Sequence, residues 1–264
     1  MPSTPRSDSP FDTRGFTRAE YSVRGVRTVV YSIGQGPPVM YWHGRGTWHG
    51  FAWARELQDH CTVLLPYHPG FGESADDPKI GSVDDYVPHY VALFDQLRLP
   101  PLPLIGASFG GFMAAHFAMA HPERISKLIL AAPFGLSSPE YLRPDYQSVP
   151  LEELPAWFVV DTTLVQAFWP DRWLERRERE QASGERALAG SRTGEAWAAG
   201  LRALKMPALI LWGRSDRLLP AGLASLWQQA LPHAQVRIID HAGHLLLDES
   251  ARARGDLELF LLQP

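Results

Sequence analysis

The fold of this chain is decided by residues 102–118, LPLIGASFGGFMAAHFA. An apolar run, 102–105, is followed by Gly-x-Ser-x-Gly, 106–110, and then by a run of small and apolar residues. This order predicts a strand, a tight turn and a helix. Ser108 stands at the centre of the turn, which exposes its side chain above the end of the strand. Its hydroxyl is therefore a candidate nucleophile.

A serine nucleophile needs two further groups. Its hydroxyl reacts poorly near neutral pH, so an imidazole must accept its proton and a carboxylate must hold that imidazole in the correct tautomer. The turn also directs the next backbone amide, that of Phe109, toward the oxygen that becomes negatively charged during attack. Gly106, Gly110 and Gly111 suit the turn, because a turn packed against a helix leaves little room for side chains.

Asp216 is the candidate carboxylate. It ends the sequence WGRSD, which overlaps the end of an apolar run, 208–212, that is typical of a strand. An aspartate in such a place can also be an ordinary turn or helix-capping residue. The other position for an acid, after the strand that follows the turn helix, is 131–134 here and has no carboxylate. The sequence therefore predicts Asp216 as the acid.

His244 is the candidate base. It stands in HAGH, residues 241–244, after the last predicted strand. His241 is the alternative because it lies closer to the end of that strand, but Gly243 gives His244 the freedom of a loop, and we favour His244. Two histidines three residues apart in a glycine loop, without a cluster of Cys or carboxylate ligands, do not indicate a metal site. The chain order is then nucleophile, acid, base.

The sequence HGRG, residues 43–46, follows the third predicted strand and is expected to supply a second amide for the negatively charged oxygen. We expect that amide from Arg45 or Gly46, and such a donor is worth about two to three powers of ten in rate. His43 is expected to hold the loop through hydrogen bonds to the backbone. The side chain of Arg45 either faces the cleft and attracts an anionic substrate or points to solvent, and the sequence leaves both open.

Apolar runs and their spacing predict an antiparallel N-terminal hairpin and, after it, strands alternating with helices on both sides of a segment without strands, 135–202. This pattern predicts an α/β fold, a doubly wound and mostly parallel sheet of about eight strands, with a helical cap inserted after the sixth strand. The core would comprise residues 1–134 and 203–264. The predicted strands are 19–23, 28–33, 39–42, 61–65, 102–105, 127–131, 208–212 and 235–239, and the predicted helices are 51–60, 83–97, 110–120, 223–231 and 246–262.

The segment 135–202 is expected to form the cap. Its charged run, 171–180, places Arg176 and Glu180 four residues apart, so that they can pair on the solvated face of a helix. Its glycines are plausible flexible points. Its aromatic side chains are expected either to line an apolar pocket or to form the cap's own core. These residues are Gly184, Gly190, Gly194 and Gly200, and Trp157, Phe158, Phe168, Trp169, Trp173 and Trp197.

Composition excludes several classes of protein. The 264 residues carry a net charge of −4, which gives no basic surface for nucleic acid. No apolar run approaches the roughly 18 residues that span a bilayer, and the polar segment 1–15 lacks the apolar stretch of a secretory signal. Cys61, the single cysteine, cannot form an internal disulfide and is expected in the core. We expect a cytoplasmic protein with a small-molecule substrate, no nucleic-acid or membrane partner, and no cofactor or metal.

Together these motifs resemble the α/β-hydrolase superfamily, over nearly the whole chain from about residue 19. The resemblance also includes HPGFGES, residues 68–74, although members usually carry Asp or another polar residue where His68 stands. Such a resemblance is a poor guide to the substrate. The site residues that it implies are Ser108, Asp216 and His244 as the catalytic triad, and Phe109 and Arg45 as the amides of the oxyanion hole.

The simplest activity for such a site is hydrolysis of small, hydrophobic carboxylic esters through an acyl-enzyme. A serine nucleophile argues against the haloalkane and epoxide relatives, which use aspartate. The alternative is a carbon–carbon bond hydrolase of the meta-cleavage-product type. These enzymes generally carry Trp directly after the catalytic histidine, where this chain has Leu245. A non-catalytic small-molecule receptor is the hypothesis from another class, and multiple turnover would exclude it.

Overall fold

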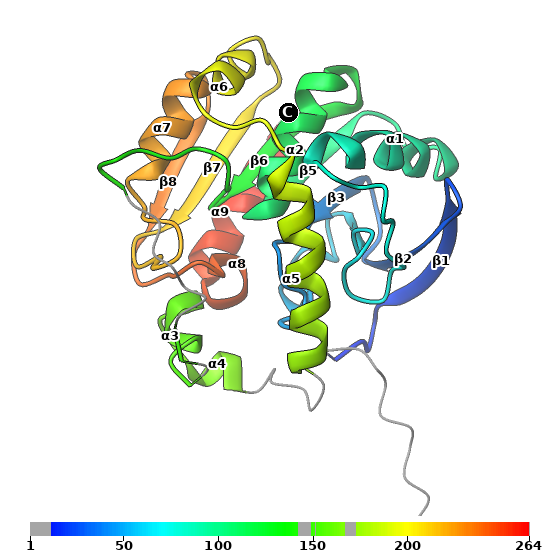
Figure 1. Ribbon diagram of the computed structural model, residues 1–264, viewed down its shortest axis with the longest axis horizontal. Coiled ribbons are helices and arrows are strands. Elements are labelled where there is room, and N and C mark those ends of the chain that lie inside the picture. Colours follow the sequence, from blue (N-terminus) through cyan, green and yellow to red (C-terminus); the bar gives the residue numbers. More distant parts are fainter. Residues whose placement is uncertain (1–11, 142–148, 151, 167–172, 264) are drawn as a thin grey trace, which may run out of the picture.

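An eight-stranded sheet forms the centre of the computed structural model, which describes residues 12–141, 149–150, 152–166 and 173–263. Figure 1 shows the strands from β1 at the right to β8 at the left. Their bounds lie close to the predicted ones. They are β1 (Thr17–Val23), β2 (Val26–Ile33), β3 (Pro38–Trp42), β4 (Thr62–Pro66), β5 (Leu102–Ala107), β6 (Ile125–Ala131), β7 (Ala208–Gly213) and β8 (Gln235–Ile239).

The strand order places the candidate nucleophile at a switch in the direction of winding. The order is β1-β2-β4-β3-β5-β6-β7-β8, so β4 and β5 lie on opposite sides of β3. β1 and β2 form the expected antiparallel hairpin, β2 pairs antiparallel with β4, and the other pairs are parallel. A doubly wound sheet opens a crevice at the carboxyl ends of the strands where the order reverses. The loops after β3 and β5 lie at that point.

Helices form a layer on each face of the sheet. On one face α1 (Tyr86–Gln96), α2 (Phe109–Ala120) and α7 (Leu223–Ala230) pack with α6 (Glu195–Leu201). On the other face η1 (Ala52–Leu57) packs with α8 (Leu246–Glu249) and α9 (Ala251–Leu262). Because helices cover the sheet on both sides, β7 is buried at all six of its positions.

Helix α2 and the side chain of Lys127 show how the sequence fits these layers. α2 is apolar on all sides and is almost entirely buried, as expected for a helix in the centre of a layer. Lys127 sits on β6, yet its ammonium reaches the end of α9, where it donates to the carbonyls of Phe260 (3.1 Å) and Leu261 (3.0 Å). A cation at a helix C-terminus satisfies carbonyls that have no helical partner.

Two predicted helices differ from the observed ones. The predicted helix 51–60 is a shorter 3₁₀ helix, because the chain turns back at Leu57, whose carbonyl accepts from the amides of both His60 and Cys61 at 3.1 Å. Cys61 is buried beside this turn, as expected. The predicted single helix 246–262 breaks between α8 and α9 at Ser250. The Ser250 side chain accepts from the Ala253 amide (3.2 Å) and thus begins a new helix.

The segment between β6 and β7 is helical, as predicted. In its described part the helices are α3 (Pro155–Phe158), α4 (Thr163–Gln166), α5 (Trp173–Ala189) and α6. α5 crosses the front of the view in Figure 1, and α3 and α4 lie at the lower left. Trp197, on α6, was predicted among the cap aromatics, but it packs on Phe112 and His116 of α2 and on Trp227 of α7. α6 therefore belongs to the layer of core helices.

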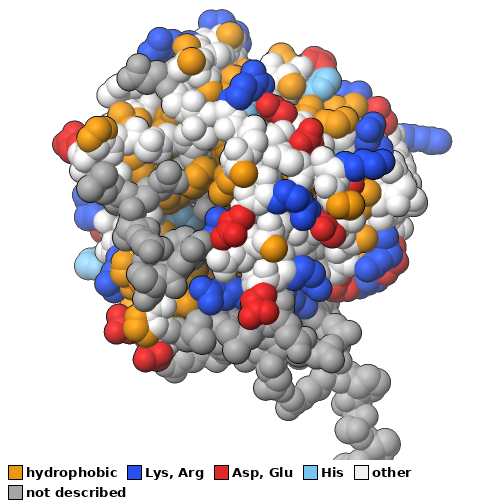
Figure 2. All heavy atoms as spheres, in the orientation of Figure 1, with side chains coloured by type: hydrophobic (Ala, Val, Ile, Leu, Met, Phe, Trp, Pro, Cys, Tyr) orange, Lys and Arg blue, Asp and Glu red, His pale blue; other side chains and the backbone are white. Residues whose placement is uncertain are grey.

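Charged side chains of both signs lie on the face of the described residues that Figure 2 shows. Figure 2 shows acidic and basic side chains intermingled on this face, and hydrophobic side chains gathered around a hollow beside α5. Among the described helices, none has the length and hydropathy needed to cross a membrane.

Candidate active site

Ser108 occupies the strained turn that the sequence predicts. Its φ of +51° and ψ of −116° lie outside the usual regions for a residue with a side chain. Its amide donates to the Ala131 carbonyl (2.9 Å), and its carbonyl accepts from Phe134 (3.0 Å), so β6 holds the turn in place. A side-chain carbon added at Gly110 would lie 2.2 Å from the Trp42 carbonyl oxygen. Only glycine fits where the turn meets β3.

Asp216 is fixed by three hydrogen bonds. Its Oδ1 accepts from the amides of Leu218 (2.9 Å) and Leu219 (2.8 Å), and its Oδ2 accepts from Nδ1 of His244 at 2.8 Å. Trp212 stabilises the same turn by donating from its indole to the Leu219 carbonyl (2.8 Å). The carboxylate is fully buried. Both of its oxygens are thus used, and it cannot turn away from the imidazole.

His244 is held by its loop as well as by Asp216. The Leu245 amide donates to the Phe158 carbonyl (2.9 Å), and the Glu249 carboxylate accepts from the Gly243 amide on the other side. With a carboxylate at Nδ1, that nitrogen carries the proton and Nε2 is left to accept one. His241 is exposed and has a φ of +56°. The structure therefore brings His244, and not His241, to Asp216.

The loop after β3 lies directly against Ser108. A side-chain carbon added at Gly44 would lie 3.3 Å from Cβ of Ser108. His43 holds the loop as expected: its Nδ1 donates to the Gly44 carbonyl (2.6 Å), and its Nε2 accepts from the His68 amide (3.1 Å). Burial lowers the pKa of His43 to about 3, so the ring is neutral. We call residues 44–50 the oxyanion loop.

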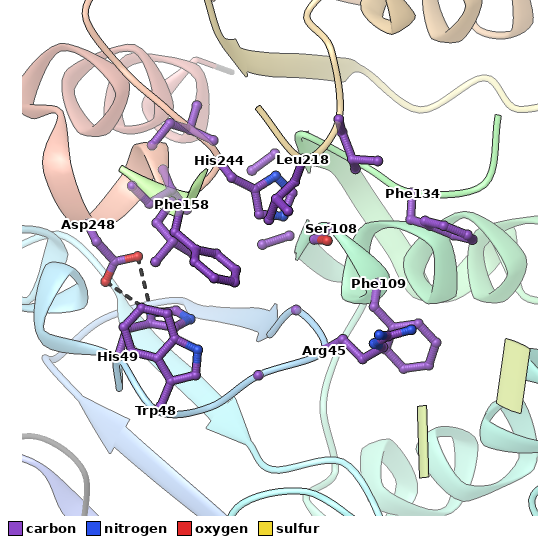
Figure 3. A pocket seen from close by; sticks show the side chains of 18 of the residues that line it. Arg45, Trp48, His49, Ser108, Phe109, Phe134, Phe158, Leu218, His244 and Asp248 are labelled. Atoms are coloured by element: carbon purple, nitrogen blue, oxygen red, sulfur yellow. Dashed lines mark hydrogen bonds and ion pairs between the residues drawn. The ribbon is translucent and has the colours of Figure 1, made fainter. Parts of the chain in front are cut away.

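The two predicted amide donors belong to Phe109, directly after Ser108, and to Arg45 on the oxyanion loop. Phe109 begins α2, so its N–H has no helical carbonyl to bond. Arg45 stands on the oxyanion loop, and both residues line the same cavity as Ser108 and His244. The Arg45 side chain is half-buried, lines the cavity (Figure 3) and packs against Gly184 of α5.

One cavity of about 850 Å³ contains these groups. This size suits a small organic ligand. Its walls are mainly apolar and come mostly from loops of the core. Of the predicted cap aromatics, Phe158 lines it; Phe168 and Trp169 lie outside the described residues. The apolar lining includes Tyr41, Trp48, Phe134, Tyr141, Leu154, Leu218, Leu219, Leu245, Leu246 and Leu247, and the charged lining includes Arg45, Arg177, Glu180 and Asp248.

A second histidine–carboxylate pair lines the cavity, and the sequence analysis missed it. Nδ1 of His49 lies 3.2 Å from Oδ2 of Asp248 (Figure 3). Burial opposes a charge on His49, but the carboxylates of Asp248 and Glu180 raise the pKa of the ring above its ordinary value. His49 stands on the oxyanion loop, and Asp248 is four residues after His244. His49 and Asp248 thus stand close in the chain to the predicted loop 43–46 and to His244, and this closeness is the sequence signal by which they could have been found.

The charged run on α5 corrects a prediction. Its residues 171–172 lie outside the described part, but Glu180 is buried, with 2% of its surface exposed. It accepts from Thr47 and Gly72 instead of lying on a solvated helix face. Burial raises its pKa, and these hydrogen bonds together with the Arg176 charge oppose that rise. Among the described residues no cluster of three or more His, Cys, Asp or Glu could hold a metal ion.

Comparison with known proteins identifies the family. The model of the alpha/beta hydrolase family matches residues 39–254. The chain belongs to this family. It is 28% identical over 248 residues to 2-hydroxy-6-oxo-2,4-heptadienoate hydrolase of Pseudomonas putida, and the match covers 86% of this chain and 90% of that protein. This member of the alpha/beta hydrolase family is thus similar to a hydrolase of a 2-hydroxy-6-oxo-dienoate.

Solved structures agree on the fold. A meta-cleavage product hydrolase of Pseudomonas fluorescens IP01 has a TM-score of 0.74 at 20% identity, over 92% of this chain and 96% of that one. A thermophilic esterase of Thermogutta terrifontis has a TM-score of 0.71 at 24% identity, over 93% and 98%. The same architecture therefore occurs in a meta-cleavage product hydrolase and in an esterase, and it does not distinguish their activities.

Proposed function

We propose that this hydrolase cleaves a carbon–carbon bond in 2-hydroxy-6-oxo-dienoates, with Ser108 as nucleophile, His244 as base and Asp216 as its orienting acid. The observation that carries the proposal is the pair of arginines, Arg45 and Arg177, on the wall of the cavity that contains Ser108 and His244. A guanidinium in a partly apolar cavity favours a ligand with a carboxylate. The similarity to the dienoate hydrolase of Pseudomonas putida supports this substrate class.

In the first step Nε2 of His244 accepts the Ser108 proton while Oγ attacks the ketone carbon at position 6 of the substrate. The carbonyl electron pair moves onto its oxygen, which receives hydrogen bonds from the amides of Phe109 and Arg45. The protonated imidazole is stabilised by Asp216, whose position is set by the hydrogen bonds described above.

In the second step the oxyanion re-forms the carbonyl, and the bond between carbons 5 and 6 breaks. For this the substrate must first ketonise, with its 2-hydroxyl proton moving to carbon 5. The electron pair of the broken bond then delocalises through carbons 3 to 5 onto the 2-oxo oxygen. That oxygen receives the proton held by His244, which restores a 2-hydroxy-dienoate. The acyl group stays on Ser108. Water, deprotonated by His244, then attacks the acyl carbon and releases a carboxylic acid. The net reaction adds one water and needs no cofactor.

We further propose that the segment 135–202 acts as the cap of this cavity, between core parts 1–134 and 203–264. Phe158 and Arg177 support this, because the segment supplies both an apolar and a cationic wall. The packing of Trp197 favours a cap that ends before α6.

Ester hydrolysis is the second candidate, and Leu245 favours it. This residue lines the cavity directly after His244, where carbon–carbon hydrolases generally carry Trp. An ester needs the same nucleophile, base and oxyanion hole, but its leaving group is an oxygen that accepts a proton readily. Ester hydrolysis therefore does not require a site that stabilises a carbanion.

The test compares 2-hydroxy-6-oxo-6-phenylhexa-2,4-dienoate with 4-nitrophenyl butyrate on the same preparation, by steady-state absorbance. We expect kcat/KM for the dienoate to exceed that for the ester at least about tenfold. Ser108→Ala should lower kcat on either substrate by about four to six powers of ten. A higher kcat/KM for the ester than for the dienoate would contradict carbon–carbon cleavage and favour ester hydrolysis, the second candidate. Absence of turnover on both, in a folded protein, would contradict the assignment of Ser108.

A further inference from the structure

One face of α5 is buried against the loops that surround Ser108. Glu180, Ser183, Gly184 and Ala187 are spaced i, i+3, i+4 and i+7, so they lie in one stripe along the helix. All four are buried, whereas Glu178 and Glu185 of the same helix are exposed. The stripe consists of polar and small residues. The helix therefore contacts the loops through hydrogen bonds and close packing, and not through large apolar side chains.

Glu180 uses both carboxylate oxygens in this stripe. Oε2 accepts from the Thr47 amide (2.9 Å), and Oε1 accepts from the Thr47 hydroxyl (2.5 Å) and the Gly72 amide (2.9 Å). Thr47 itself is buried, with 1% of its surface exposed. Hydrogen bonds to a carboxylate are stronger than those between neutral groups, and water does not compete with them here. A helix of the inserted segment thus holds the backbone of the oxyanion loop.

Gly184 brings α5 close to the same loop, one turn further along. A side-chain carbon added there would lie 2.5 Å from Cδ and 2.6 Å from Cγ of Arg45. Gly184, one of the plausible flexible points of the segment, thus leaves space for the Arg45 side chain. Ser183 contacts the neighbouring loop in the same way, since a carbon added at Gly70 would lie 2.5 Å from its Oγ.

We propose that Glu180 is a positioning residue that holds the oxyanion loop, and with it the Arg45 amide, in the geometry needed for catalysis. Thr47 is two residues from Arg45, and the hydrogen bonds at Thr47 limit the movement of the intervening peptides. A donor that shifts by about 1 Å from the developing oxyanion can cost about a hundredfold in rate. Glu180 acts in the step in which the oxyanion forms, so the inference rests on Ser108 being the nucleophile but not on which bond is cleaved.

The decisive variant is Glu180→Gln, measured by steady-state kinetics on whichever substrate turns over faster. Glutamine has nearly the same shape, but one of the two acceptor oxygens becomes an amide nitrogen that only donates. Either the Thr47 amide, or the Thr47 hydroxyl together with the Gly72 amide, therefore loses its acceptor. We expect kcat to fall about tenfold to a hundredfold while KM stays within about twofold, because the substrate still binds the unchanged cavity. Because buried donors lose an acceptor, the thermal midpoint should fall as well, and the kinetic constants are therefore measured well below it.

Thr47 supplies a second, independent pair of variants. Thr47→Val keeps the amide but removes the hydroxyl that donates to Oε1, so it should lower kcat less than Glu180→Gln does. Thr47→Ser keeps the hydroxyl and should recover most of the rate lost in Thr47→Val. Combined with Glu180→Gln, Thr47→Val should cost little more than Glu180→Gln alone, because both changes remove the same contact.

The matched control is Glu178→Gln, on the same helix but exposed, which should leave both kinetic constants unchanged. A fluorophosphonate probe adds a readout that needs no substrate. Its labelling of Ser108 should slow in Glu180→Gln by a factor similar to the loss in kcat. If folded Glu180→Gln keeps the wild-type kcat and labelling rate, the proposal is wrong. If the wild type itself neither turns over nor labels, the assignment of Ser108 fails first.

Discussion

The cavity contains two histidine–carboxylate pairs, and the difference between them shows what makes an imidazole suitable as a base. The Asp216 carboxylate is fully buried and bonds two backbone amides besides His244. The Asp248 side chain is 12% exposed. Among the described residues, the hydrogen-bond and ion-pair partner of its carboxylate is His49. The first carboxylate is held by its own turn. The second one depends on the imidazole that it accompanies.

The two imidazoles also differ in their surroundings. His49 stands on the oxyanion loop and pairs with Asp248 of α8, so it joins that loop to the helix. His244 bonds Asp216 through Nδ1, and its ring borders the cavity beside Ser108 (Figure 3). We infer that His49 has a structural task and that His244 has a chemical one. The predictions below separate them.

The largest effect is expected for Asp216→Asn. The asparagine amide can donate to Nδ1 of His244 and thereby place the proton on Nε2, the nitrogen that must accept from Ser108. We expect kcat to fall about ten thousandfold with a small change in KM. The measurement is steady-state hydrolysis at neutral pH, with circular dichroism to show that the variant is folded. A loss below about tenfold would exclude Asp216 as the orienting acid.

A smaller effect is expected for Asp248→Asn, which breaks the second pair. His49 loses the charge that holds it, and the oxyanion loop loses one of its anchors. We expect kcat to fall about tenfold and the free energy of unfolding to fall by about 1–3 kcal/mol. If Asp248→Asn matched the loss in Asp216→Asn, the two pairs would have equivalent roles and the comparison would be wrong.

The stability difference between Asp248→Asn and the wild type should depend on pH. The groups that act on His49 are the carboxylates of Asp248 and Glu180. Because the folded pKa of His49 is raised, the pair stabilises the protein fully below the unfolded value of 6.5 and loses this contribution as pH rises through the raised pKa. Urea unfolding at several pH values from 5.5 to about 9 should therefore show the largest difference at the acidic end. A difference that grows with pH would contradict the assigned charge.

The smallest effect is expected for His241→Asn. His241 is exposed in a left-handed turn position, and asparagine tolerates that conformation better than most residues. Both kinetic constants should stay within about twofold of the wild type. A large loss of kcat would return His241 to the role that the geometry gives to His244.

Sequence alone predicted the parts of the site that depend on local patterns. Ser108 lies in a turn whose glycines and flanking runs are adjacent in the chain, and Asp216 and His244 each follow an apolar strand. The strand alternation likewise predicted the fold. In physical terms, these features are fixed by neighbours within about ten residues, and a single sequence reports such neighbours well.

The features that sequence could not predict depend on distant partners. Glu180 bonds Thr47 across 133 residues, and His49 meets Asp248 across 199. A glutamate in a charged run is usually solvated, and nothing near Glu180 in the chain indicates that two loop amides will surround it. Gly184 is similar, because the Arg45 side chain that requires a glycine there comes from another part of the chain.

The attachment of the inserted segment has a consequence for protein engineering. Its first part bonds the loop of His244, through the Phe158 carbonyl and the contact of the Val160 amide (2.8 Å) with Glu249. Its later part bonds the oxyanion loop through Glu180. A chimera that received this segment from a relative would therefore inherit donors and acceptors made for other loops. Exchange of substrate range by such grafting requires that Thr47, Gly72 and Glu249 be exchanged together with the segment.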